Sequence, residues 1–272
     1  GGVITGLTRL QKNKRIIFTE GDDDIAYLKA MNEAFKRVNS PSAIDFSKIS
    51  FWYIRGKDNM NLKIMANKQL LSQAVQGCKY AVIFDKDYST EDTNTKFINS
   101  DILRRLGNSS WAHTHNGYCI ESVLFSEMDK LKKFLNKITG KDEETINTFL
   151  DEYFYELKQS LSNVQSNIYL NMKEKFKSQK KPTRPELDNV EFDIYAGEAA
   201  QNIHYAMNKD NIRAFVLKIE EEWGITLFQK EDDASETFAS GLLNKYIDSI
   251  EVADDIYNDY VILFRKIRDF IV

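Results

Sequence analysis

Two groups of carboxylates in this chain each follow an apolar run, and together they could bind divalent metal. The first group contains Glu20 and Asp24, and the second contains Asp85 and Asp87. Open α/β sheets place their sites where strands end, so the two groups would converge if the apolar runs are neighbouring strands. Four negative charges in one pocket require cations. The pattern therefore predicts divalent metal and an anionic substrate.

The acids in these groups are not equivalent. Glu20 ends an apolar run, where a buried carboxylate is costly unless a partner or a metal compensates its charge. Asp22 and Asp23 are expected to cap a helix, because acids are favoured at helix N-termini. Asp85 and Asp87 are two residues apart and would point to the same side of an extended segment. For this pair the alternative is a solvated strand-to-loop junction, where Asp is common.

Short apolar runs alternate with helical periodicity in the segments that must position these acids. We expect strands at 15–19, 49–54, 80–84 and 111–114, and helices at 25–38, 62–75 and 98–106. This alternation is typical of a mostly parallel, Rossmann-like sheet with flanking helices.

The second half of the chain lacks clear strands. We expect helices there at 126–138, 143–161, 163–178, 197–207, 210–223, 237–247 and 253–270. The predicted fold class is therefore α/β followed by a helical C-terminal region, with an α/β domain at 1–125 and the helical region at 126–272.

Composition limits the classes of function. With 272 residues and 42% hydrophobic content, the chain can bury a sizeable core. Its net charge of −4 gives no overall attraction to nucleic acid, so a nucleic-acid enzyme would need a local basic patch. Cys78 and Cys119 suggest no disulfide framework, which favours a reducing cytoplasm. We see no membrane-spanning run and no signal peptide, and we expect a cytoplasmic protein without a membrane partner.

The order of the acidic motifs resembles the TOPRIM domain, which topoisomerases, primases and OLD-family nucleases share. The matching residues are Glu20, Gly21 and Asp24 after one apolar strand, and Asp85 and Asp87 after a later one. The resemblance implies a TOPRIM-like fold for the α/β domain.

A third segment narrows the resemblance. Residues 118–124, Tyr-Cys-Ile-Glu-Ser-Val-Leu, resemble the Ile-Glu-x-Tyr-Leu segment of OLD-like TOPRIM nucleases, although Val123 replaces the Tyr. The chain is also similar to stand-alone TOPRIM proteins that work with ABC-type ATPases against phage, such as the nuclease subunit of PARIS. The resemblance covers about residues 12–125.

The resemblance implies the roles of a two-metal nuclease. Glu20 would be a general acid/base or a metal ligand, and Asp24, Asp85 and Asp87 would hold Mg²⁺ or Mn²⁺. Glu121 would complete a second metal site. One ion would activate water and the other would stabilise the leaving oxygen. For Glu121 the alternative is a helix N-terminal acid.

Basic residues supply candidate nucleic-acid contacts at two places. Arg55 and Lys57 follow the second predicted strand, and Lys57 is the candidate catalytic contact to the scissile phosphate. A later basic stretch includes Lys177, Lys180 and Lys181, which could follow a phosphate backbone. In both places the alternative is a solvated surface.

His113 and His115 form the last pair of candidate ligands. We interpret them as a strand end and a loop, with a metal role as the alternative.

The leading prediction is a metal-dependent endonuclease that hydrolyses phosphodiester bonds in DNA or RNA, tRNA included. It would be an anti-phage effector controlled by an ABC- or AAA-type ATPase partner, and a homodimer would provide two sites for cutting two strands. One alternative is a haloacid-dehalogenase-like phosphatase with Asp85 as nucleophile and Asp87 as acid/base, since the segment 82–87 resembles its first motif. The other alternative is a non-catalytic TOPRIM-like binding module.

Overall fold

The computed structural model describes residues 11–54, 60–107, 110–179, 185–227 and 234–272. The chain divides into two compact units, the first made of residues 1–85, 91–115 and 250–272 and the second of residues 86–90 and 116–249. The structure does not determine how the two units are placed relative to one another.

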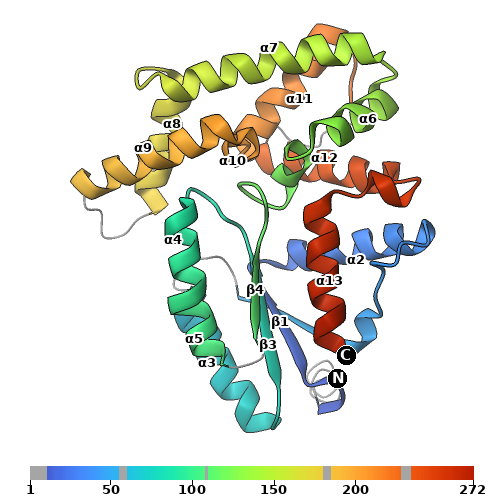
Figure 1. Cartoon of the computed structure of the whole chain (residues 1–272), viewed down its shortest axis with the longest axis vertical. Coiled ribbons are helices and arrows are strands. Elements are labelled where there is room, and N and C mark those ends of the chain that lie inside the picture. The colour runs from blue at the N-terminus through green and yellow to red at the C-terminus, as the bar shows by residue number, and fades with distance from the viewer. Residues whose placement is uncertain (1–10, 55–59, 108–109, 180–184, 228–233) are drawn as a thin grey trace. The chain divides into compact units, whose positions relative to one another are not determined.

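A four-stranded parallel sheet forms the centre of the first unit, in the order β2-β1-β3-β4 (Figure 1). The strands are β1 (Arg15–Thr19), β2 (Ser50–Tyr53), β3 (Lys79–Phe84) and β4 (Trp111–Thr114). The central strands β1 and β3 are almost fully buried, as expected of parallel strands covered on both faces. The prediction of an α/β fold with a parallel sheet is confirmed.

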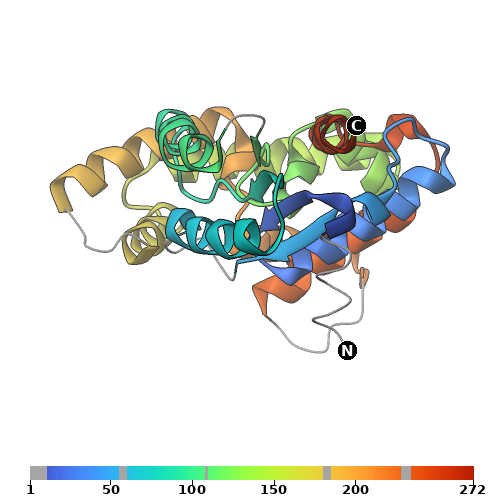
Figure 2. The same ribbon diagram turned by 90° about the horizontal axis from the view of Figure 1, so that it is seen from below.

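Helices cover both faces of this sheet (Figures 1 and 2). One face carries α3 (Met60–Ala74), α4 (Glu91–Lys96), the π-helix η2 (Phe97–Leu103) and α5 (Arg104–Leu106). Alternate strand residues such as Phe18 and Val82 pack into the core on that side. The other face carries α2 (Asp22–Arg37) and α13 (Asn258–Ile271), which meet where the rings of Phe35 and Phe264 lie 4.5 Å apart.

The helix α13 belongs to the first unit although it is the last helix of the chain. Its apolar side packs on the sheet, where Phe270 lies 5.7 Å from Trp111, ring centroid to centroid. The Nε of Arg15 also donates a hydrogen bond of 2.7 Å to the carbonyl oxygen of Phe270. Residues 250–272, which the sequence analysis placed in the helical C-terminal region, therefore complete the cover of the sheet.

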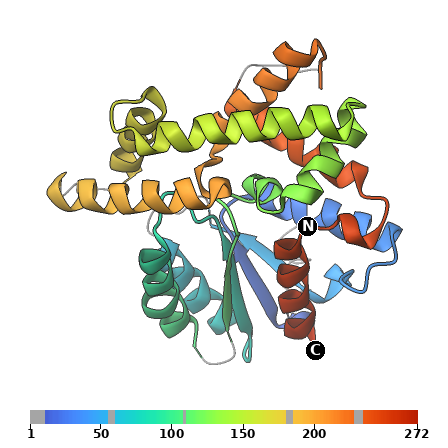
Figure 3. The ribbon, with the colours of Figure 1, turned by 45° about the horizontal axis from the view of Figure 1, so that its top comes forward.

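The second unit is helical. It contains the 3₁₀ helix η3 (Glu121–Phe125) and the helices α6 (Met128–Thr139), α7 (Glu143–Ser162), α8 (Asn167–Gln179), α9 (Pro185–Gln201), α10 (Ile203–Ala206), α11 (Lys209–Trp223) and α12 (Ser235–Ser249). Figure 3 shows α7 running alongside α9. Aromatic rings fill its core; Phe125, for example, lies 5.0 Å from Phe215, ring centroid to centroid. In the described part of the chain, no helix has both the length and the apolar character needed to cross a bilayer.

Three helices differ most from the sequence expectation. The helix expected at 98–106 starts at Glu91 and passes through the π-helical segment. The helix expected at 197–207 starts at Pro185, because proline is well suited to the first helical position. The helix expected at 253–270 starts at Asn258, after the short 3₁₀ helix η4 (Ala253–Asp255).

Candidate metal centre at the carboxyl edge of the sheet

The carboxyl ends of β1 and β3 are neighbours at the point where the chain connections after these strands lead to opposite sides of the sheet. From β1 the chain crosses to β2 on one side, whereas β3 lies on the other side of β1. Such a topological switch point is where open α/β sheets bind ligands. Glu20 directly follows β1, and Asp85 directly follows β3. The sheet thus brings the first acid of each predicted group to this edge.

A hydrogen bond joins these two residues. The backbone N–H of Asp85 donates to Oε1 of Glu20 over 3.0 Å, across 65 residues of sequence. Glu20 and Asp85 are both half-buried. This bond fixes the orientation of the Glu20 carboxylate at the edge of the sheet.

Asp24 is held against the turn that follows β1. Its Oδ2 accepts a hydrogen bond of 2.9 Å from the backbone N–H of Gly21, the residue before α2. Thr19 donates from Oγ1 to the carbonyl oxygen of Gly21, also over 2.9 Å. The sequence analysis expected Asp22 and Asp23 to cap the helix; they are exposed acids of its first turn, and the carboxylate that bonds to the turn belongs to Asp24.

Asp87 belongs to the second unit. Its φ of +53° is left-handed, a conformation that Asp tolerates better than most residues. The expectation that the chain stays extended from Asp85 to Asp87 is therefore wrong, because β3 ends at Phe84 and the backbone turns. The covalent chain alone keeps the Cα atoms of the two acids within about 7 Å.

The residue between these acids is buried in the second unit. The Nζ of Lys86 lies 3.4 Å from the ring centroid of Tyr205 and 4.0 Å from Oε2 of Glu198. The backbone N–H of Asp87 donates to the carbonyl oxygen of Tyr118 over 2.9 Å. These contacts hold residues 86 and 87 within the second unit.

Glu121 is a buried acid of the second unit. It is only 3% exposed, and its Oε2 has no hydrogen-bond partner in the described part of the chain. The Nζ of Lys209 lies 4.0 Å from its other oxygen. A buried carboxylate oxygen without a partner is unfavourable, and a bound cation would satisfy it. The surroundings of the Glu121 carboxylate therefore fit a role as metal ligand.

The segment before Glu121 is closely packed on itself. Ser122 Oγ accepts a hydrogen bond of 2.8 Å from the backbone N–H of Cys119 and donates one of 2.7 Å to its carbonyl oxygen. A Cβ at Gly117 would lie 3.1 Å from both the carbonyl carbon of Ser122 and the backbone nitrogen of Val123. Glycine is required here because backbone approaches backbone.

Replacing Gly117 by Ala is expected to destabilise the second unit by about 1–3 kcal/mol, the range for overpacking a filled site. Gly197→Ala is the matched control, since a Cβ there meets no atom within 4 Å. That control is expected to stabilise α9 by about 0.4–1 kcal/mol. Urea unfolding followed by far-ultraviolet circular dichroism measures both changes. Equal effects of the two substitutions would contradict the packing argument.

The basic candidates are Arg55, Lys57, Lys177, Lys180 and Lys181, and only Lys177 is among the described residues. Arg55, Lys57, Lys180 and Lys181 lie outside the described residues. Lys177 is half-buried in α8.

Two other lysines of α8 already have acidic partners in the second unit. The Nζ of Lys173 lies 3.6 Å from Oδ1 of Asp193, and Lys175 pairs with Asp210. These pairs leave less positive charge for a phosphate backbone than the sequence run suggests.

A second group of candidate ligands lies within the first unit. His113 and His115 are buried with Asp259, and one ligand atom of each lies within 4.8 Å of the others. The group could hold a metal ion. His113 is in β4 and His115 directly follows it, so the interpretation as a strand end and a loop is confirmed. Nothing in the local sequence indicated that Asp259 joins the two histidines, because it is 144 residues from His115.

Burial and hydrogen bonding set the charges of this group. Burial lowers the pKa of His113 below its usual value, against the opposing effect of Asp259. Burial alone would raise the pKa of Asp259, but hydrogen bonds with His113 and His115 outweigh it and hold the pKa of this carboxyl below its usual range. Asp259 is therefore ionised at neutral pH.

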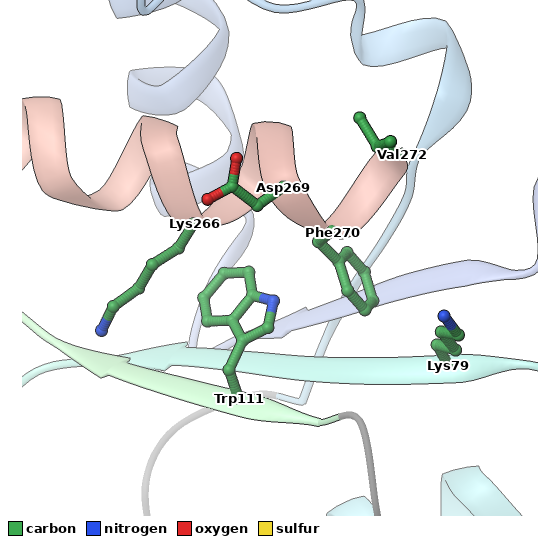
Figure 4. Close-up of a pocket in the computed structure, with 6 residues that line it drawn as sticks. All are labelled: Lys79, Trp111, Lys266, Asp269, Phe270 and Val272. Carbon is green, nitrogen blue, oxygen red and sulfur yellow. The ribbon is translucent and has the colours of Figure 1, made fainter.

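A pocket of about 360 Å³ opens at the other end of the strands (Figure 4). It is lined by Lys79, Trp111, Lys266, Asp269, Phe270 and Val272. Lys79 and Trp111 are the first residues of β3 and β4, so the pocket lies at the amino end of these strands. Sites of parallel sheets lie at the carboxyl edge, and the predicted acids do not line this pocket.

No family model matches the chain, and no curated protein matches its sequence. Fold and site together define an α/β protein whose parallel sheet carries two acids at its topological switch point.

Proposed function

We propose that this protein is a metal-dependent nuclease of the TOPRIM type, resembling OLD-family nucleases, which hydrolyses phosphodiester bonds in DNA or RNA. The observation that supports this most is the hydrogen bond of 3.0 Å between Asp85 and Glu20 at the switch point of the sheet. The bond joins the Glu20 carboxylate to the backbone of a second acid where α/β sheets bind ligands, and acids at such an edge suit a metal-assisted hydrolase.

The acids have separate tasks in this proposal. Asp24, Asp85 and Asp87 hold Mg²⁺ or Mn²⁺, which when bound stabilises the charge that develops on the phosphate. Glu20 is oriented by the N–H of Asp85 and either joins the ligands or transfers a proton. Glu121 contributes a buried carboxylate whose Oε2 finds no hydrogen-bond partner among the described residues, which supports a role as ligand of a second ion.

The wider setting of this function rests on the TOPRIM resemblance. The nuclease is proposed to act in the cytoplasm as an anti-phage effector, as a homodimer and under the control of an ABC- or AAA-type ATPase. The net charge of −4 means that nucleic acid must bind at a local patch, for which Lys57 and Lys177 are candidates.

The test is a cleavage assay of the purified chain with plasmid DNA and total tRNA. We expect cleavage of at least one substrate with Mg²⁺ or Mn²⁺ and loss of cleavage with EDTA, because the acids alone cannot stabilise the transferred charge. Where the chain alone is inactive, the assay is repeated with the partner ATPase present.

The alternatives give different outcomes in the same assay. Hydrolysis of a phosphate monoester, with a fluoroberyllate adduct on Asp85, would indicate the phosphatase. Binding of nucleic acid or a protein partner without cleavage under any condition, and with no effect of Glu20→Ala, would indicate the binding module. Either result would contradict the nuclease proposal.

A further inference from the structure

Three ligand-type side chains converge where β4 ends and α13 begins, within the first unit. His113, His115 and Asp259 are 4%, 3% and 8% exposed, so the group is closed to solvent. It is formed only when α13 packs on the sheet, because Asp259 is in the first turn of that helix. None of the three is among the acids assigned to the nuclease site.

The separations of these atoms are unusual for hydrogen bonds. Nε2 of His113 and Nδ1 of His115 each lie 3.4 Å from the same oxygen, Oδ2 of Asp259. Hydrogen bonds between charged partners are commonly about 2.7–2.9 Å. Around a tetrahedral Zn²⁺ with bonds of about 2.0–2.1 Å, neighbouring ligand atoms are about 3.3–3.4 Å apart. The two separations from Oδ2 of Asp259 therefore match the spacing of ligands around an ion, and the two histidine nitrogens lie within 4.8 Å of each other.

The strand and the helix orient the ligands before any ion binds. His113 and His115 are two residues apart, so in an extended segment both point to one face of the sheet. That face is the one covered by α13, as Figure 4 shows for Trp111 of β4 and Phe270 of the helix, which face each other. Asp259 approaches from the helix side.

Lys266 is on the same helix as Asp259, but it does not bind this carboxylate directly. The Nζ of Lys266 donates instead to the carbonyl oxygen of Ala112 over 3.3 Å. Lys266 and Asp259 interact electrostatically at longer range. Burial lowers the pKa of Lys266, and the negative charge of Asp259 opposes this lowering. Among the described residues, the ion-pair partners of the buried Asp259 carboxylate are therefore the two imidazoles and no Lys or Arg.

We propose that His113, His115 and Asp259 form a Zn²⁺ site that fastens α13 to the edge of the sheet. Imidazole and carboxylate ligands suit zinc, and three protein ligands leave a fourth position for water. Burial of all three side chains favours a structural role over a catalytic one. Ligands 144 residues apart would let the ion stabilise a long-range contact of the fold.

Zinc content tests the site. Tag-free protein is treated with a chelator, dialysed against Zn²⁺ and then against buffer, and analysed by mass spectrometry of the metal. We expect one zinc per chain in the wild type and a loss of affinity of at least about 10- to 100-fold in His115→Gln and Asp259→Asn. Controls are His204→Gln, which alters the third histidine, and Asp85→Asn, which alters the proposed nuclease site; both are expected to retain the zinc.

Two further measurements test the site even if a variant fails to fold. X-ray absorption at the zinc edge of the wild type is expected to show two imidazole ligands, and Zn²⁺ is expected to raise the melting temperature of the wild type but not of Asp259→Asn. A wild type that binds no zinc, or zinc that is lost in Asp85→Asn but kept in Asp259→Asn, would overturn the proposal. The group would then be two histidines hydrogen-bonded to one carboxylate.

Discussion

Glu20→Gln is expected to lower the rate of phosphodiester cleavage by at least about 100-fold, the lower bound for removing a general acid/base or one transition-state contact. Glutamine has the same shape, and its amide oxygen can still accept the backbone N–H of Asp85 that Glu20 accepts at 3.0 Å. The substitution removes the negative charge that would bind metal or take a proton. Initial rates with Mg²⁺ measure the change.

Asp22→Asn is the matched control for this prediction. It removes one negative charge two residues away, at an exposed position in the first turn of α2. Its effect is expected to be limited to weaker stabilisation of the helix N-terminus, about 0.3–1 kcal/mol, with cleavage unchanged. Equal loss of cleavage in both variants would point to a general charge effect, and full activity in Glu20→Gln would remove Glu20 from the mechanism.

The dependence on metal concentration separates the two roles of Glu20. If Glu20 is a ligand, the variant should need more Mg²⁺ to reach its own maximal rate. If Glu20 transfers a proton, the maximal rate should fall at unchanged metal affinity, and its dependence on pH should change.

Phe264→Ala is expected to destabilise the first unit by about 3–5 kcal/mol, the usual cost of deleting a buried phenyl ring. Phe264 is fully buried, and its ring centroid lies 4.5 Å from that of Phe35 in α2 and 6.0 Å from that of Phe46. The substitution would leave a cavity where α13 packs on α2, so α13 would lose much of its packing against the first unit.

Urea unfolding followed by tryptophan fluorescence measures this loss. Trp52 and Trp111 are in the first unit and Trp223 is in the second, so a Trp223→Phe background reports on the first unit alone. Ile262→Ala is the control on the same helix; Ile262 is 37% exposed, and the expected loss is about 1 kcal/mol or less. Comparable losses for both variants would mean that α13 does not depend on this contact.

The four strands of the first unit, and the acids that follow two of them, were predicted from the sequence alone. Runs such as 15–19 and 80–84 are short and apolar, and such runs between amphipathic helices form buried parallel strands. Once these strands are parallel, residues that directly follow them, Glu20 and Asp85, must lie at one edge. The local sequence pattern was sufficient to predict this position, because the direction of parallel strands determines at which edge of the sheet the residues after them lie.

Only the tertiary structure decided which remote segments meet. The strand order β2-β1-β3-β4 makes β1 and β3 neighbours, which produces the switch point and the bond between Glu20 and Asp85. The left-handed turn at Asp87 and the packing of α13 on the sheet, with Asp259 beside the two histidines, had no local signal. The hydrophobic periodicity of a helix or strand indicates that one of its faces is buried. Which other segment covers that face depends on packing across the whole chain.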